Sequence, residues 1–186
     1  MKKIILFLIM IFILTGIDGQ SVSLIHNPLI TPVNSNFVVY VHLDTITQIR
    51  GCSVWINYDP QKITFISAMR GSIWDGFSSF WWQCVQETSN RIRIENIIMG
   101  AGLYVMGPGN LLNITFQANS EEGYSSIYFS NIELYDLIGN IISAVTYSNC
   151  DVIIGSSPIF TKIKCWLEGP YSNGLMQTNL SNSLPL

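Results

Sequence analysis

Apolar and polar residues alternate with a period of two along much of this chain. The clearest run is Cys52–Tyr58 (CSVWINY), whose even-numbered residues are apolar or aromatic. Successive side chains of a β-strand point to opposite faces of the sheet, so this run predicts a strand with one buried face. No window of about twelve residues shows the 3.6-residue apolar repeat of an amphipathic helix.

Turn signals divide the alternating runs into short strands. Asp59-Pro60 predicts a turn, because proline presets φ and aspartate can close an Asx turn. Ser89-Asn90 and Gly139-Asn140 each separate two runs and predict hairpins. The predicted strands are Phe37–Leu43, Cys52–Tyr58, Ile63–Ala68, Phe80–Thr88, Arg91–Ile97, Leu111–Ala118, Ser125–Ser130, Ile132–Tyr135, Ile141–Thr146 and Val152–Ile154. Short strands at this spacing predict an all-β sandwich or barrel.

The apolar sides of these strands predict the core. A domain of roughly 130 to 160 residues is long enough to bury one. We expect much of this core to consist of Val39, Val41, Val54, Ile56, Tyr58, Leu112, Ile114 and Phe116.

The first nineteen residues have the pattern of a targeting segment. Lys2 and Lys3 precede an unbroken apolar run of eleven residues, Ile4–Leu14, which is short for a membrane span. Small residues follow, up to Gly19, where cleavage would fit. We therefore predict a signal peptide over residues 1–19 and a secreted or cell-surface protein. An uncleaved N-terminal anchor is the alternative.

Composition and charge narrow the classes of protein that fit. Hydrophobic residues make up 48% of the 186-residue chain and charged residues only 11%, a balance that excludes intrinsic disorder. Nine basic residues against twelve acidic ones, in no cluster, argue against nucleic-acid binding. With a single apolar stretch near the length of a span, the chain is not a multi-span membrane protein, and we expect no membrane contact after signal cleavage.

The four cysteines predict neither a defined disulfide nor a metal site. Cys52, Cys84, Cys150 and Cys165 allow three pairings, and the sequence does not choose between one disulfide and buried free thiols. Their spacing includes no CxxC pair, so a zinc site has no support. We expect neither a metal nor a cofactor.

Four motifs carry a family resemblance. They are Ile49–Pro60 (IRGCSVWINYDP), Ser67–Gly71 (SAMRG), Gly107–Phe116 (GPGNLLNITF) and Ile132–Asn140 (IELYDLIGN). In this order and spacing they resemble the cohesin domain, the β-sandwich with which scaffold proteins of cellulose-degrading bacteria bind dockerin modules. The resemblance covers residues 21–155. It implies a nine-stranded jelly roll, a fold shared with certain cellulose-binding modules.

The predicted cohesin-like domain spans residues 20–155. Gly155–Pro158 lacks bulky side chains and is typical of a linker. Within residues 156–186, the segment Lys164–Tyr171 (KCWLEGPY) is similar to one that recurs in multidomain exported proteins of Bacteroidetes-like bacteria. We therefore expect a linker followed by the truncated start of a further module.

The resemblance implies that a partner binds the outward face of the sheet containing residues 51–58. Alternation puts Gly51, Ser53, Trp55 and Asn57 on that face. Type I cohesins often have Asn and Asp at the positions of Gly51 and Ser53, and this chain has neither. An outward Trp55 would expose a large apolar area, which is typical of a contact site. Packing of Trp55 under a loop or a neighbouring module is the alternative.

A second group of aromatic residues suggests a different ligand. Flat aromatic rings stack on the apolar faces of sugars, and Trp74, Trp81 and Trp82 lie close together in the chain. Consecutive residues of a strand point to opposite faces, so Trp81 and Trp82 cannot join one platform. Trp74 and Trp81 are the candidates for polysaccharide binding.

Catalysis has no support in the sequence. None of the acidic residues forms an evident pair across a cleft, as glycoside hydrolysis requires. No HExxH, GxSxG, Walker A or EF-hand pattern occurs, and Asp136–Asn140 is better interpreted as a tight turn than as a calcium loop. Three hypotheses remain: a non-catalytic module binding a dockerin-like protein, a carbohydrate-binding module of the same superfamily, and a structural spacer domain.

Overall fold

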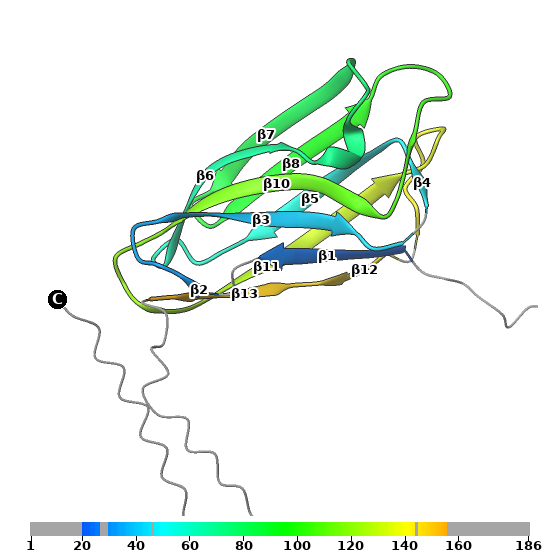
Figure 1. Ribbon diagram of the computed structural model, residues 1–186. Coiled ribbons are helices and arrows are strands. Elements are labelled where there is room, and N and C mark those ends of the chain that lie inside the picture. Colours follow the sequence, from blue (N-terminus) through cyan, green and yellow to red (C-terminus); the bar gives the residue numbers. More distant parts are fainter. Residues whose placement is uncertain (1–19, 27–29, 46, 144, 156–186) are drawn as a thin grey trace, which may run out of the picture.

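The computed structural model describes residues 20–26, 30–45, 47–143 and 145–155, which form a β-sandwich (Figure 1). Its elements are β1 (Gln20–His26), β2 (Ile30–Thr31), β3 (Asn36–Leu43), β4 (Gln48–Ile49), β5 (Gly51–Asn57), β6 (Ile63–Arg70), the 3₁₀ helix η1 (Ser72–Trp74), β7 (Phe80–Thr88), β8 (Arg91–Ile98), β9 (Val105–Met106), β10 (Gly109–Ala118), β11 (Gly123–Tyr135), β12 (Val145–Ser148) and β13 (Cys150–Ile154). Apart from η1, no helix occurs among the described residues, which confirms the all-β prediction.

Two main sheets make up the sandwich. The five-stranded sheet has the order β12-β1-β3-β10-β6, and the six-stranded sheet has the order β2-β13-β11-β5-β8-β7. β4 and β9 form a small separate pair. Most neighbours are antiparallel, but β1 pairs with β12, and β13 with β2, in parallel. This arrangement is the jelly-roll sandwich that the sequence led us to expect.

The core between the sheets contains all eight residues predicted for it, each no more than 4% exposed. Alternation explains this result, because buried and more accessible residues alternate regularly along β3 and β8. Phe116 is central to the aromatic packing: its ring lies 5.3 Å from that of Tyr58 and 5.8 Å from that of Phe37, measured between centroids. The sequence therefore predicted which side of each strand faces inward.

Two predicted turns are confirmed. β7 and β8 form a hairpin around residues 89 and 90, with Thr88 paired to Arg91. The Asp59 side chain accepts a hydrogen bond from the backbone N–H of Gln61 at 2.9 Å, and its carbonyl accepts one from Ile63 at 2.9 Å. Asp59 therefore stabilises the turn between β5 and β6.

The turn predicted at Gly139-Asn140 is present, but the two predicted strands beside it do not form a hairpin beyond one antiparallel bridge. Ser125–Ser130 and Ile132–Tyr135 are one strand, β11, in which a bulge between Phe129 and Asn131 resets the alternation. After β11 the chain makes a single bridge, Tyr135 to Ile141, and crosses to the other sheet. There β12 runs parallel to β1. The segment that was predicted to pair with its neighbour in sequence therefore pairs with a strand near the start of the described chain.

β1 is a strand that the sequence analysis did not predict. Its Val22 and Leu24 are buried in the core, while β3 and β12 flank it in the five-stranded sheet. The alternation in Gln20–His26 was a usable signal, because it matches that of the other strands. The predicted signal peptide, residues 1–19, and the predicted linker and module start, residues 156–186, lie outside the described residues. Within the described ranges, no helix is long and apolar enough to cross a bilayer.

Candidate partner-binding face

The outward side of β11, β5, β8 and β7 forms one continuous surface, which we call the outer face. Strand register arranges its residues in rows across the four strands. The first row holds Tyr135, Gly51, Ile97 and Trp81, the second Glu133, Ser53, Glu95 and Gln83, and the third Asn131, Trp55, Arg93 and Val85. β5 thus lies in the middle, so that its side chains are flanked on both sides.

This central position buries Gly51 and Ser53, two of the predicted contact residues. Ser53 is only 2% exposed, and its hydroxyl lies 2.9 Å from the hydroxyl of Tyr135. At Gly51 an added Cβ would come within 2.6 Å of the Asn96 carbonyl oxygen, so the position has no room for a side chain. Both residues therefore lie beneath the surface of the outer face, and neither offers a partner an accessible side chain.

Tyr135 covers Ser53 and links it to Glu133 through two hydrogen bonds. Its hydroxyl donates to the Glu133 carboxylate at 2.8 Å. Burial raises the pKa of the Tyr135 phenol, and the lowering by the Ser53 hydrogen bond is opposed by the hydrogen bond and charge of Glu133. The phenol is therefore a neutral donor at physiological pH.

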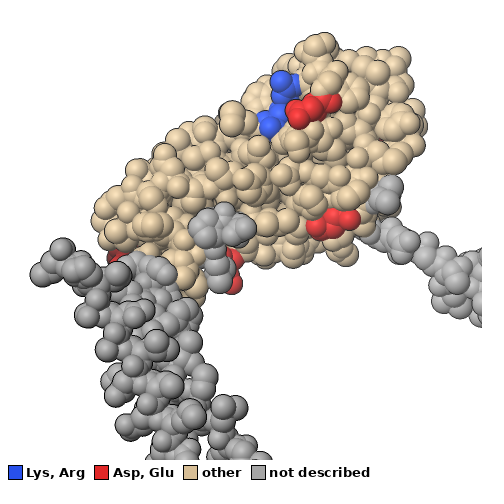
Figure 2. Space-filling model, viewed as in Figure 1, with Lys and Arg blue, Asp and Glu red and all other residues tan. Residues whose placement is uncertain are grey.

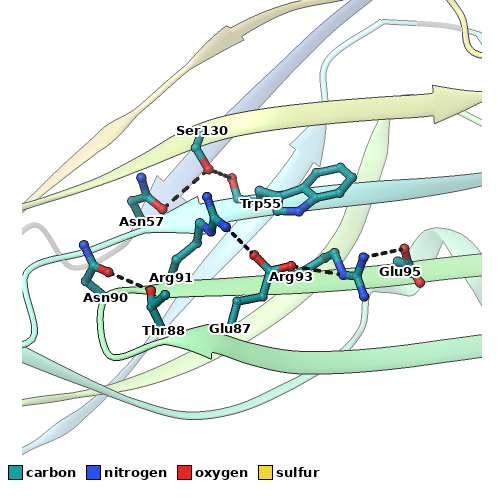
Figure 3. A network of polar contacts seen from close by, with 9 residues as sticks. All are labelled: Trp55, Asn57, Glu87, Thr88, Asn90, Arg91, Arg93, Glu95 and Ser130. Carbon is teal, nitrogen blue, oxygen red and sulfur yellow. Dashed lines mark hydrogen bonds and ion pairs between the residues drawn. The ribbon is translucent and has the colours of Figure 1, made fainter.

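Trp55 and Asn57 stay accessible at the centre of the outer face (Figure 3). Trp55 is half-buried and sits between Arg93 on β8 and Asn131 on β11. Ser130, the bulged residue of β11, donates to the Trp55 carbonyl and to the Asn57 side chain at 3.4 Å each. The bulge therefore ties β11 to the strand that presents the indole.

A charge network lies beside Trp55 and connects β7 with β8. Arg91 pairs with Glu87 at 2.8 Å, Arg93 contacts the same carboxylate at 3.4 Å, and Arg93 reaches Glu95 at 3.8 Å (Figure 3). Two arginines and two glutamates balance each other, so this part of the face has ordered charges and no net charge. The side shown in Figure 2 differs, since it is mostly uncharged.

An apolar area lies at the end of the outer face. Trp81 is 53% exposed and pairs across the strands with Ile97, while Met99, two residues further on, is 48% exposed. Ile97 and Met99 were missed by the sequence analysis. The alternation of β8 would have shown Ile97, because it shares a side with Arg91, Arg93 and Glu95.

Trp74 does not form a sugar platform. It is 2% exposed, its indole N–H donates to the Leu111 carbonyl at 2.7 Å, and it packs edge-on against Phe80. Trp82 packs against the core from the inner side of β7, as expected for the neighbour of an outward Trp81. Of the two aromatic residues proposed for polysaccharide binding, only Trp81 is accessible.

The described residues contain no grouping suited to metal binding, since no three His, Cys, Asp or Glu side chains come together. The Asp136 carboxylate accepts hydrogen bonds from the backbone N–H groups of Ile138 and Asn140, which is the tight turn predicted there. Partial desolvation acts to raise the pKa of Asp136, but the hydrogen bonds from Asn140, Ile138 and Gly139 outweigh it and lower that pKa. The carboxylate therefore serves the turn.

Cys52, Cys84 and Cys150 are free thiols. Burial raises the pKa of Cys52 to about 12, and burial together with the charge of Asp151 raises that of Cys150 to about 12. A thiol with so high a pKa is neutral and a poor nucleophile at physiological pH. Cys165 lies outside the described residues.

Comparison with known proteins gives a consistent result. A family model described as "Cohesin domain" matches residues 29–154. No curated protein matches the chain. A type II cohesin domain from the cellulosome of Acetivibrio cellulolyticus aligns with a TM-score of 0.64 at 15% identity, covering 72% of this chain and 95% of its own.

Two further solved structures are similar. A non-cellulosomal cohesin from the hyperthermophilic archaeon Archaeoglobus fulgidus has a TM-score of 0.60 and 17% identity over 74% of this chain and 92% of its own. The sixth cohesin of scaffoldin B from Acetivibrio cellulolyticus, solved in complex with a dockerin, has a TM-score of 0.59 and 19% identity over 74% and 98%. At these identities the likeness concerns the fold.

Proposed function

This chain belongs to the cohesin domain family, whose members are non-catalytic binding modules, and we propose that it binds a dockerin-like protein module through its outer face. We further propose that it does so outside the cell, because residues 1–19 have the pattern of a signal peptide. Cell fractionation and N-terminal sequencing test that part: protein found only inside the cell contradicts export, and an intact residue 1 contradicts cleavage of the signal peptide.

The observation that carries the proposal is the composition of the outer face. It presents the half-buried Trp55 at its centre and the exposed Trp81 at its end, with an internally neutralised charge network between β7 and β8. Protein interfaces concentrate binding energy in tryptophan and arginine residues held in ordered surroundings. A rigid sheet surface of this kind is suited to a folded partner.

We expect this chain to recognise its partner through other residues than type I cohesins do. Gly51 and Ser53 are buried where those cohesins often have Asn and Asp, so polar recognition from these two positions is not available. Trp55 and Asn57 follow Ser53 on the same side of β5 and stay accessible, and Arg93 lies opposite Trp55 on β8. We therefore place the main contact on this trio.

The test is a pull-down with the chain as bait against exported proteins of the source organism, with insoluble cellulose and xylan in parallel. We expect capture of a protein that mass spectrometry shows to carry a dockerin-like module. Trp55→Ala should weaken its binding at least about thirtyfold, the loss expected at an interface hot spot. Tyr124→Ala is the matched control, because Tyr124 is 74% exposed on β11 but lies outside the rows around Trp55.

Each contrary outcome has a definite meaning. Retention on a polysaccharide alone, lost in Trp81→Ala, would make the chain a carbohydrate-binding module and overturn the proposal. Equal loss in Trp55→Ala and Tyr124→Ala would contradict a contact centred on Trp55. Binding to nothing in either arm would leave a structural spacer domain.

A further inference from the structure

The five-stranded sheet carries almost no charge. Its strands β12, β1, β3 and β10 contain no Asp, Glu, Lys or Arg residue. β6 contains one, Arg70 at its last position, whose guanidinium stands 3.8 Å over the ring centre of Phe80 in the other sheet. Figure 2 shows this side of the molecule, with uncharged residues over β3 and β10. We call the outward side of β1, β3, β10 and β6 the neutral face.

The polar side chains of the neutral face are amides, hydroxyls and one imidazole. Along β10, Asn113, Thr115 and Gln117 alternate with residues buried in the core, so they point outward. Amides and hydroxyls each act as donor and as acceptor. Sugar hydroxyls do the same, whereas a carboxylate, phosphate or ammonium group would meet no opposite charge on β1, β3 or β10.

Two of these polar groups are already held in place. Nδ1 of His42 on β3 lies 2.7 Å from Oδ1 of Asn110 on β10, and the register sets the two residues opposite each other. Their hydrogen bond fixes the imidazole and the amide, which lowers the entropy that a ligand contact would cost.

One row across the strands adds apolar surface. Register places Ile25, Tyr40, Asn113 and Met69 side by side on β1, β3, β10 and β6. Ile25 is 40% and Met69 is 61% exposed, and Tyr40 between them is half-buried. A tyrosine ring presents an apolar body with a polar tip, which suits the C–H face and the hydroxyls of a pyranose. Neighbouring strands lie about 4.8 Å apart, close to the length that one sugar adds to an extended chain, so such a chain would set successive sugars over successive strands.

We propose that the neutral face binds an extended, uncharged polysaccharide, which lies across β1, β3, β10 and β6 with Tyr40 stacked on one of its sugars. This site is on the opposite side of the sandwich from the outer face and goes beyond the proposed protein binding. Both sites can be occupied at once, so the chain would join a polysaccharide to a protein that carries a dockerin-like module.

Other ligand classes fit the neutral face less well. Nucleic acids and anionic membranes are held by clusters of Lys and Arg, and the strands of this face contain only Arg70, which is turned toward Phe80. Protein interfaces concentrate their energy in Trp, Tyr and Arg, and the strands of the neutral face contain no Trp. Its exposed apolar side chains lie on the flanking strands β1 and β6, with the polar residues of β10 between them, so they form no contiguous apolar patch. Charge and hydrogen bonding therefore favour the uncharged polysaccharide.

The test is native affinity electrophoresis of the full chain in gels that contain hydroxyethylcellulose, glucomannan or arabinoxylan, with the anionic carboxymethylcellulose as comparison. We expect at least one uncharged polymer to retard the chain. Tyr40→Ala should raise the dissociation constant at least about tenfold, because one stacked ring is lost. Met69→Ala should raise it at least about threefold, and because Met69 is 61% exposed, this variant keeps the fold even where Tyr40→Ala does not.

The controls separate the neutral face from the outer face. Tyr124→Ala removes a tyrosine that is 74% exposed on β11, and Trp81→Ala an exposed tryptophan of β7; both should leave the retardation unchanged. Tyr40→Ala should leave capture of the protein partner unchanged, so failure of either proposal is recognised independently of the other. No retardation by any uncharged polymer, retardation by carboxymethylcellulose alone, unchanged retardation of both Tyr40→Ala and Met69→Ala, or its loss in Trp81→Ala would each overturn the proposal.

Discussion

Trp74 and Trp81 show how one residue type serves different ends within a few positions of the chain. Trp74 is the last residue of the short η1 helix, and its side chain is buried in the core, where the indole N–H donates to the Leu111 carbonyl. Trp81 points outward from β7 and keeps half of its surface in water. Their sequence contexts are similar, and the difference arises from the strand register and from the fold of η1.

The two tryptophans should respond very differently to truncation. Trp74→Ala removes a buried indole together with its hydrogen bond to the Leu111 carbonyl, so we expect a loss of about 3–5 kcal/mol of unfolding free energy. Trp81→Ala should cost within about 0.5 kcal/mol, as exposed substitutions usually do. Urea unfolding of both variants measures the difference. Equal losses would contradict the placement of Trp74 in the core.

At the scale of elements, glycines give the recognised motifs a physical basis. Gly71 ends the Ser67–Gly71 motif and donates its N–H to the Leu111 carbonyl at 2.9 Å. A Cβ added there would stand 2.1 Å from the Asn110 carbonyl oxygen. Glycine is therefore needed because the chain after β6 passes directly against the backbone of β10.

Gly71→Ala should consequently destabilise the fold. The methyl group would meet backbone atoms that cannot rotate away, and overpacking of this kind costs about 1–3 kcal/mol. Ser72→Ala, one residue further on and exposed, is the matched control and should change stability little. Thermal unfolding of the two variants gives the comparison, and an unchanged midpoint for Gly71→Ala would show that β10 can move aside.

Element order was harder to predict than element type. Strands that pair with their neighbours in sequence, such as β7 and β8, were placed correctly because a two-residue turn fixes the register. β11 and β12 were misassigned because a bulge hides the continuity of one and the other finds its partner more than a hundred residues earlier, in β1. Such pairing is decided by packing of the whole sandwich and leaves no local signal.

At the scale of the molecule, two surfaces stand apart. The outer face of the six-stranded sheet carries the accessible tryptophans and the charge network, whereas the side shown in Figure 2 is mostly uncharged. We therefore expect a protein partner to bind the first of these two surfaces.

The sequence by itself determined the all-β class, the family resemblance, the eight core positions and the outward side of β5. These follow from the two-residue period and from turn chemistry, which are local properties of the chain. Only the tertiary structure decided which outward residues a partner can reach. Ser53 and Gly51 are buried because the two neighbouring strands and Tyr135 cover them. Trp74 lies in the core. Strand register places Ile97 and Trp81 side by side. Accessibility depends on neighbours distant in sequence, so no local pattern could have supplied it.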